Sequence, residues 1–170
     1  MELLLGCGHS HFKRVWSNDD RDWKQLVALD MTREVNPDVV ADIASNCLPF
    51  KDDSFDEIHA YEVLEHMGQQ GDWKFFFAQF DELSRILKSG GRFYLTTPKM
   101  GSQWVWGDPG HTRYIGPQSL YFLDRDNYQK NMENGTSMTD YRTYFKSDWL
   151  TEFVDISGES NVMILKNKKG

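Results

Sequence analysis

Two glycines and two aspartates near the start of the chain have the spacing of a nucleoside-binding site. Gly6 and Gly8 form a Gly-x-Gly turn directly after an apolar run, and Asp30 and Asp42 end two further apolar runs. Glycine lets a ligand approach the backbone closely and permits a positive φ. A carboxylate at the end of a neighbouring strand accepts hydrogen bonds from both hydroxyls of a ribose. The pattern predicts a site for a nucleoside-containing ligand.

A second group of reactive side chains lies in the run WVWGDPGHTRY, residues 104–114. His111 is the candidate general base, because a free imidazole titrates near pH 6.5. Asp108 is the candidate to orient it, and Arg113 the candidate to hold an anionic substrate. The alternative is a structural loop whose His and Asp side chains bond to backbone. The aromatic residues expected to form a stacking wall for the substrate are Trp104, Trp106 and Tyr114.

Strands and helices alternate over the first hundred residues, which predicts an α/β fold with a mostly parallel sheet and helices on both faces. The apolar periodicity predicts a helix over 73–88 that stops at Ser89-Gly90-Gly91. A short helix over 11–17, capped by Ser10, is expected after the glycine turn. The strands are expected at residues 3–5, 25–29, 39–41, 56–60 and 92–96. All the candidate residues then follow strands, where ligands of such sheets bind.

The second half of the chain has a different pattern. Residues 99–116 form a long loop, 117–123 a helix, and 126–139 a polar, irregular segment with an Asn-Gly turn. Two final strands, 149–156 and 162–166, form an antiparallel hairpin. We expect one domain over 1–170, with a cofactor-binding half (1–98), a substrate-covering region (99–146) and a terminal hairpin (147–167).

Composition restricts the class of protein. The net charge of −7 disfavours a nucleic-acid partner. No apolar run approaches the roughly 20 residues that span a bilayer, and no signal peptide is recognised. Only two cysteines occur, which favours a reducing, cytoplasmic location. The cysteines and the nearby histidines lack zinc-site spacing, so no metal is expected at Cys7, His9, His11 or Cys47.

Four motifs together resemble the class I S-adenosylmethionine-dependent methyltransferases, and within them the small type 11 group. The matching segments are LLLGCGHS (3–10), VALDM (27–31), ADIASNCLPFKDDSFDEIHAYEVLEHM (41–67) and ELSRILKSGGRFYLTTP (82–98). The resemblance covers about residues 1–98. It implies a Rossmann-like, seven-stranded sheet that closes with an antiparallel strand inserted beside the fifth.

The resemblance also implies a role for each matching residue. Asp30 binds the ribose of S-adenosylmethionine, and Met31 packs against its adenine. Asp42 and Ile43 lie at the adenine edge. The residues around the methionine part of the cofactor are Gly6, Cys7, Gly8, Tyr61 and Glu62. The product is S-adenosylhomocysteine.

Three features depart from the family pattern. The acidic residue usually found two positions before the first glycine is Leu4 here, and Glu2 is the candidate to replace it. Ser10 stands in place of a third glycine. The chain begins at its first strand, so we expect the fold to lack the usual N-terminal covering helix. An uncovered site gives this chain a reason to pair as a homodimer.

The expected activity is methyl transfer to a small-molecule acceptor by in-line displacement, in which the protein mainly orients the reactants. One alternative is a non-catalytic cofactor-binding or interaction module, favoured by Leu4 and the expected lack of a covering helix. A nicotinamide-dependent oxidoreductase is the second alternative. It requires a glycine at position 11, which is His11.

Overall fold

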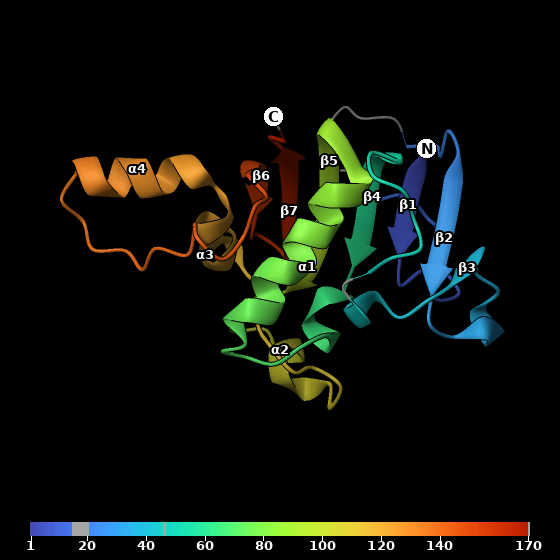
Figure 1. Cartoon of the computed structure of the whole chain (residues 1–170). Helices are drawn as coiled ribbons and strands as arrows, with labels where there is room; N and C mark the ends of the chain where they lie inside the picture. The colour runs from blue at the N-terminus through green and yellow to red at the C-terminus, as the bar shows by residue number, and fades with distance from the viewer. Residues whose placement is uncertain (15–20, 46, 170) are drawn as a thin grey trace.

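The computed structural model describes residues 1–14, 21–45 and 47–169. Seven strands form one sheet in the order β3-β2-β1-β4-β5-β7-β6 (Figure 1). Strand β7 is antiparallel to β5 and β6, and the other pairs are parallel. The strands are β1 (Glu2–Leu5), β2 (Leu26–Asp30), β3 (Val39–Val40), β4 (Phe55–Tyr61), β5 (Leu87–Pro98), β6 (Trp149–Asp155) and β7 (Ser160–Asn167). The predicted α/β sheet with an inserted antiparallel strand is confirmed.

The longest helix, α1, crosses one face of this sheet (Figure 1). Its N-cap Asp72 accepts a hydrogen bond of 3.1 Å from the Phe75 amide. Its apolar side chains recur at helical spacing and are buried against the sheet. The remaining helices are α2 (Trp104–Gly107), α3 (Pro117–Leu120) and α4 (Arg125–Glu133), after α1 (Trp73–Ile86). Single 3₁₀ turns are η1 (Arg33–Val35), η2 (Ile43–Ser45), η3 (Leu64–His66) and η4 (Tyr121–Leu123).

Alternate residues of each strand face opposite layers of the core. Leu3 and Leu5 face α1 and belong to the main apolar cluster, together with Phe80 of the helix. Leu4 faces the other way, in a small cluster that includes Trp23. The face covered by α1 therefore carries most of the apolar burial that fixes the strands in place.

The opposite face carries residues 11–14, where the short helix expected over 11–17 would begin. Residues 11–14 are not helical, and 15–17 lie outside the described residues. The conformation of residues 11–14 is set by the side chain of Lys13. Its ammonium lies 2.9 Å from Glu2 and 2.7 Å from Glu57. These two ion pairs hold the segment close to the sheet.

The end of α1 also differs from the expected stop at residues 89–91. The helix ends at Ile86, and β5 begins at the next residue. The Ser-Gly-Gly segment instead makes an irregularity within β5, where Gly90 has a φ of 76°. A Cβ on Gly91 would lie 2.9 Å from the Asp56 carbonyl oxygen, so glycine is needed where β5 passes β4.

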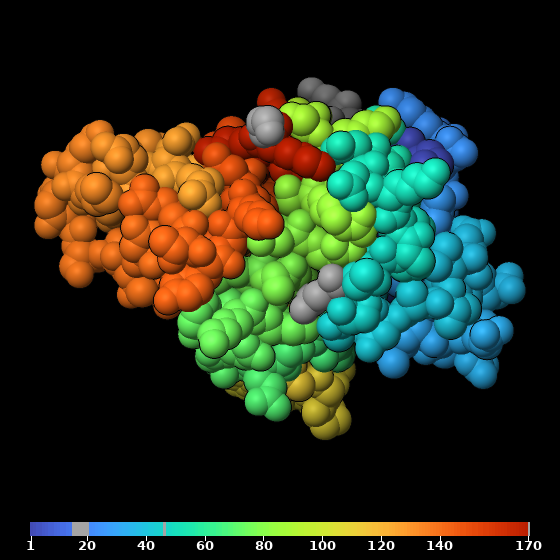
Figure 2. All heavy atoms as spheres, in the orientation of Figure 1, coloured from blue at the N-terminus to red at the C-terminus, as the bar shows by residue number. Residues whose placement is uncertain are grey.

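Residues 124–146 form a lobe beside α1 in the space-filling view (Figure 2). The expected helix over 117–123 is present as α3 and η4. The irregular segment expected over 126–139 is wrong in its first part, because 125–133 form α4. The buried side chain of Tyr128 anchors this otherwise polar helix. Within the described ranges, no helix has the length and apolar character needed to cross a bilayer.

Candidate active site

A cavity of about 400 Å³ opens at the carboxyl ends of β1, β2 and β4. This is the end of the sheet toward which the arrows of the parallel strands point in Figure 1. Six of the nine predicted cofactor residues line it, and all lie at or shortly after the carboxyl ends of strands. The lining residues are Gly6, Asp30, Met31, Asp42, Ile43, Ala44, Glu62, Val63, His66 and Met67.

The glycine turn after β1 forms one wall of the cavity. Gly6 and Gly8 have φ values of 59° and 50°, in the left-handed region that favours glycine. A Cβ on Gly6 would lie 2.7 Å from Cγ2 of Val63, whereas nothing lies within 4 Å of a Cβ on Gly8. The Gly6 position is thus a close approach that only glycine fits.

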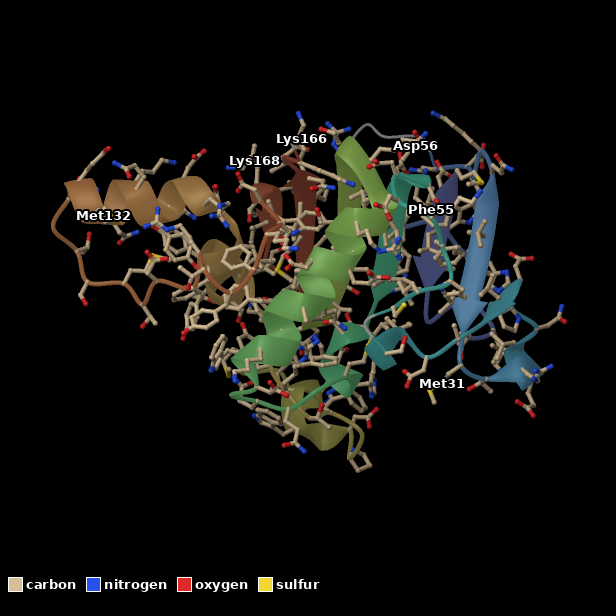
Figure 3. All side chains as sticks on the ribbon, viewed as in Figure 1. Met31, Phe55, Asp56, Met132, Lys166 and Lys168 are labelled. Atoms are coloured by element: carbon tan, nitrogen blue, oxygen red, sulfur yellow. The ribbon has the colours of Figure 1, made fainter. Side chains whose placement is uncertain are left out.

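The two aspartates are oriented by backbone amides two residues further along. Asp30 accepts from the Thr32 amide at 2.9 Å, and Asp42 from the Ala44 amide at 2.8 Å. Carboxylate oxygens accept more than one hydrogen bond each, so these contacts leave capacity for ligand hydroxyls. Met31 is 69% exposed and projects from the end of β2 (Figure 3). The arrangement offers polar acceptors beside an apolar surface.

Three predicted cofactor residues lie outside this lining. Gly8 does not line the cavity, but its amide donates a hydrogen bond of 3.0 Å to Asp30, which does. Cys7 is buried in the small cluster behind the sheet, and burial raises the pKa of its thiol. The hydroxyl of Tyr61 bonds to the backbone of Arg14 at 3.0 Å. A direct role for these three residues stays a prediction.

Glu2 does not replace the missing acidic residue at position 4. It sits at the start of β1, where its carboxylate pairs with Lys13 and accepts from the Lys24 amide at 2.9 Å. Leu4 itself is buried on the face away from α1. Neither residue lines the cavity.

The predicted base, His111, is held beside the cavity by the turn η3. The Thr112 amide and the Arg113 amide both donate to the Glu65 carbonyl. The imidazole of His111 packs edge-on against His66, with ring centroids 4.5 Å apart. Because His66 lines the cavity, this edge-on ring contact places His111 next to the cavity.

The protonation of His111 follows from its hydrogen bond. Nδ1 lies 3.1 Å from the Val105 carbonyl oxygen, which can only accept, so Nδ1 carries the proton. In the neutral imidazole the lone pair is then on Nε2, which lies 3.9 Å from Oε1 of Glu65 and 3.8 Å from Oδ2 of Asp108. The predicted partner Asp108 is thus near His111, although not hydrogen-bonded to it.

Glu65 is a site residue that the sequence reading did not single out. Its side chain is almost fully buried, and burial, together with the charge of Glu62, raises its pKa to about 8. The run EVLEH was the only signal available, because the contact with His111 joins residues far apart in the chain. A buried carboxyl group beside two imidazoles can hold a proton or a cation.

The predicted acceptor residues are not gathered at this cavity. Trp104 and Trp106 project from α2 and are 56% and 59% exposed. Arg113 is buried, donates from Nε to the Leu64 carbonyl at 2.9 Å and from Nη2 to Gln79, and burial lowers its pKa to about 10. Tyr114 lines a second cavity of about 220 Å³ with Arg113. Their acceptor role stays a prediction.

Comparison with known proteins gives a family match over the same region. The family model described as "Methyltransferase domain" matches residues 3–95. No curated protein matches the chain. Among solved structures, a SAM-dependent methyltransferase from Archaeoglobus fulgidus has a TM-score of 0.59 at 13% identity, covering 97% of this chain and 85% of that one.

Two further solved structures are similar. An S-adenosylmethionine-dependent methyltransferase from Mesorhizobium loti has a TM-score of 0.56 at 13% identity, covering 97% of this chain and 89% of that one. The YcgJ protein from Bacillus subtilis has a TM-score of 0.52 at 18% identity, covering 99% and 92%. At these identities the structures show a shared fold. The family model matches more than half of the chain, which therefore belongs to the type 11 methyltransferase family, class I enzymes that use S-adenosylmethionine.

Proposed function

We propose that this protein transfers a methyl group from S-adenosylmethionine to a small-molecule acceptor and releases S-adenosylhomocysteine. The observation that carries the proposal is that Asp30 and Asp42 line the same cavity as Gly6. Bound S-adenosylmethionine supplies a methyl group on a positively charged sulfur. The close approach at Gly6, which a Cβ would fill, fits a ligand lying against the backbone.

Four residues of the cavity have a defined part in holding the adenosine portion of the cofactor. Asp30 accepts from the ribose hydroxyls, because it ends the strand next to the glycine turn. Asp42 accepts from the adenine amino group. Met31 and Ile43 provide the apolar surface for the ring. A cavity of this volume lies within the range of about 300–1,000 Å³ typical of small-molecule sites.

The chemistry requires little beyond orientation. A lone pair of the acceptor forms the bond to the methyl carbon, the carbon–sulfur bond breaks, and the sulfur keeps the electron pair. Holding the reactants in line contributes up to about 7–11 kcal/mol. A hydroxyl or amine acceptor must also lose a proton, and for that step the site offers the lone pair on Nε2 of His111.

We place the acceptor among small molecules and the protein in the cytoplasm. The net charge of −7 disfavours a polyanionic substrate. Both cysteines are free thiols, which fits a reducing compartment. A homodimer that covers the open cavity is part of the same proposal.

Calorimetric titration of the full chain with S-adenosylhomocysteine tests the proposal, with NAD as the competing ligand. We expect S-adenosylhomocysteine to bind and NAD not to bind. Asp42→Asn should weaken binding at least tenfold. Asp155→Asn is the matched control, because Asp155 also accepts an amide two residues later, at 2.8 Å, but lies on β6. NAD binding, or equal affinities of the two variants, contradicts the assignment.

A further inference from the structure

Glu65 is a buried carboxylate that lacks a hydrogen-bond donor among the described residues. Its residue is 1% exposed, and neither carboxylate oxygen has a partner there. Oε1 of the neighbouring Glu62 is also buried without a described partner. The buried guanidinium of Arg113 donates its hydrogen bonds to Leu64 and Gln79, so its charge acts on Glu65 only from a distance. Unpaired carboxylates are costly to bury, so this corner of the site calls for a cation or a proton.

Two imidazoles complete the cluster. Ligand atoms of Glu65, His66 and His111 all lie within 4.8 Å of one another. The hydrogen bond from Nδ1 of His111 to the Val105 carbonyl leaves Nε2 facing Glu65. A backbone carbonyl that fixes one nitrogen of an imidazole is the outer contact usual for a metal-binding histidine. Oδ2 of Asp108 lies 3.8 Å from the same Nε2.

We propose that Glu65, His66 and His111 bind a first-row divalent transition ion such as Zn²⁺ or Mn²⁺ as three protein ligands and leave a fourth coordination position open. Two imidazole nitrogens and carboxylate oxygens suit these ions better than they suit Mg²⁺ or Ca²⁺, which prefer oxygen ligands alone. Around Zn²⁺ the ligand atoms stand about 3.4 Å apart, so the cluster must contract slightly. The side chain of His66 is exposed, so it is the ligand that can shift toward Glu65 and His111.

The position of the ion relative to the cavity indicates its role. His66 lines the cavity that holds Gly6 and Asp30, so an open coordination position of the ion faces the ligand space. An ion there binds a hydroxyl oxygen of the acceptor and lowers its pKa, and the proton leaves to solvent, so His111 then acts as a ligand of the ion and no longer as the base. The class of acceptor is therefore a hydroxyl compound. This role rests on the proposed function, whereas ion binding does not.

The test uses the full chain after removal of metal by a chelator. Calorimetry measures binding of Zn²⁺, Mn²⁺ and Mg²⁺, and Co²⁺ serves as a spectroscopic probe because its visible absorption reports nitrogen and oxygen ligands. We expect one Zn²⁺ or Mn²⁺ per chain, bound more tightly than Mg²⁺. His66→Gln should weaken binding at least tenfold and change the Co²⁺ spectrum, and Glu65→Gln should do the same. His9→Gln is the matched control, because His9 is also an exposed histidine but lies outside the cluster.

Titration with S-adenosylhomocysteine runs in parallel and separates the two proposals. A cooperative unfolding transition of His66→Gln at the wild-type midpoint shows that this variant is folded and that its loss of ion binding is local to the cluster. The metal site is overturned if the wild type binds S-adenosylhomocysteine but none of the transition ions, or if His9→Gln weakens ion binding as much as His66→Gln does. Preference for Mg²⁺ over Zn²⁺ and Mn²⁺ also overturns it.

Discussion

The amide of Gly8 donates a hydrogen bond of 3.0 Å to Oδ2 of Asp30, which ties the glycine turn after β1 to the end of β2. The other oxygen of this carboxylate accepts from the Thr32 amide. One side chain therefore fixes two backbone segments of the cavity wall. Its geometry is set before any ligand arrives, which reduces the ordering that binding must pay for.

Asp30→Asn is expected to weaken S-adenosylhomocysteine binding by about 1.5–3 kcal/mol, because the charged acceptor is lost. Calorimetry measures the change. Asp38→Asn is the control, since Asp38 also accepts a backbone amide, that of Ala28 at 2.8 Å, but is not part of the cavity. An Asp30→Asn protein that binds as tightly as Asp38→Asn would remove the carboxylate from the site.

Gly6→Ala is expected to lower the free energy of unfolding by more than Gly8→Ala does. Both positions have a left-handed φ, which costs an alanine about 1–2 kcal/mol. Only at Gly6 does the new Cβ also meet Val63. Chemical denaturation measures both variants.

A second substitution tests the cause of the Gly6→Ala effect. Val63→Ala in the Gly6→Ala background should recover part of the lost stability, because it removes the Cγ atoms that the new methyl group meets. No recovery would mean that the backbone conformation alone is responsible.

Glu57 is expected to make stability depend on acidic pH. Burial alone would raise its pKa, but hydrogen bonds from His59 and Lys13 lower it to about 2. The folded state thus holds the ionised form more strongly than the unfolded state does. The stabilisation is complete above the unfolded pKa of about 4.5 and is lost as pH falls toward 2, an effect of the order of 2 kcal/mol.

Denaturation curves between pH 2 and pH 7 check this expectation. Glu57→Gln should be less stable than the wild type at pH 7. Between pH 4.5 and 2 its free energy of unfolding should fall much less than that of the wild type. Glu34→Gln, at an exposed position in η1, should keep the wild-type profile. Parallel profiles for Glu57→Gln and the wild type would show that Glu57 is not the group responsible.

Arg113→Gln is expected to cost about 2–4 kcal/mol of stability, because it leaves the Leu64 carbonyl and Gln79 without their buried donor. Arg92→Gln removes an exposed ion pair with Glu152 and should cost less than about 1 kcal/mol. Thermal or chemical unfolding gives both values. Similar small losses in the two variants would free Arg113 for a substrate role.

Much of the cavity could be predicted because it depends on local pattern. Apolar runs that end in Gly6, Asp30 and Asp42 define strands and place their ends, and a parallel sheet then brings those ends to one edge. Glu65 and His111 are brought together by backbone hydrogen bonds between η3 and a loop distant in the chain. No local pattern encodes such a contact.

The wrong predictions of secondary structure also arise from contacts between residues distant in the chain. The helix α4 has a strongly polar sequence, and only the burial of Tyr128 identifies its inner face. A helix over 11–17 is expected after the glycine turn, but the carboxylates of Glu2 and Glu57 hold Lys13 against the sheet. In both cases a tertiary contact decides the local conformation.

Strand β7 follows β6 in the chain but is inserted between β5 and β6. During translation, β6 leaves the ribosome before the strand that joins it to the sheet exists. Until residues 160–167 have emerged, the nascent chain has unpaired backbone edges on both β5 and β6. Such edges bind other extended chains readily, so this interval is when the newly made protein most needs a chaperone.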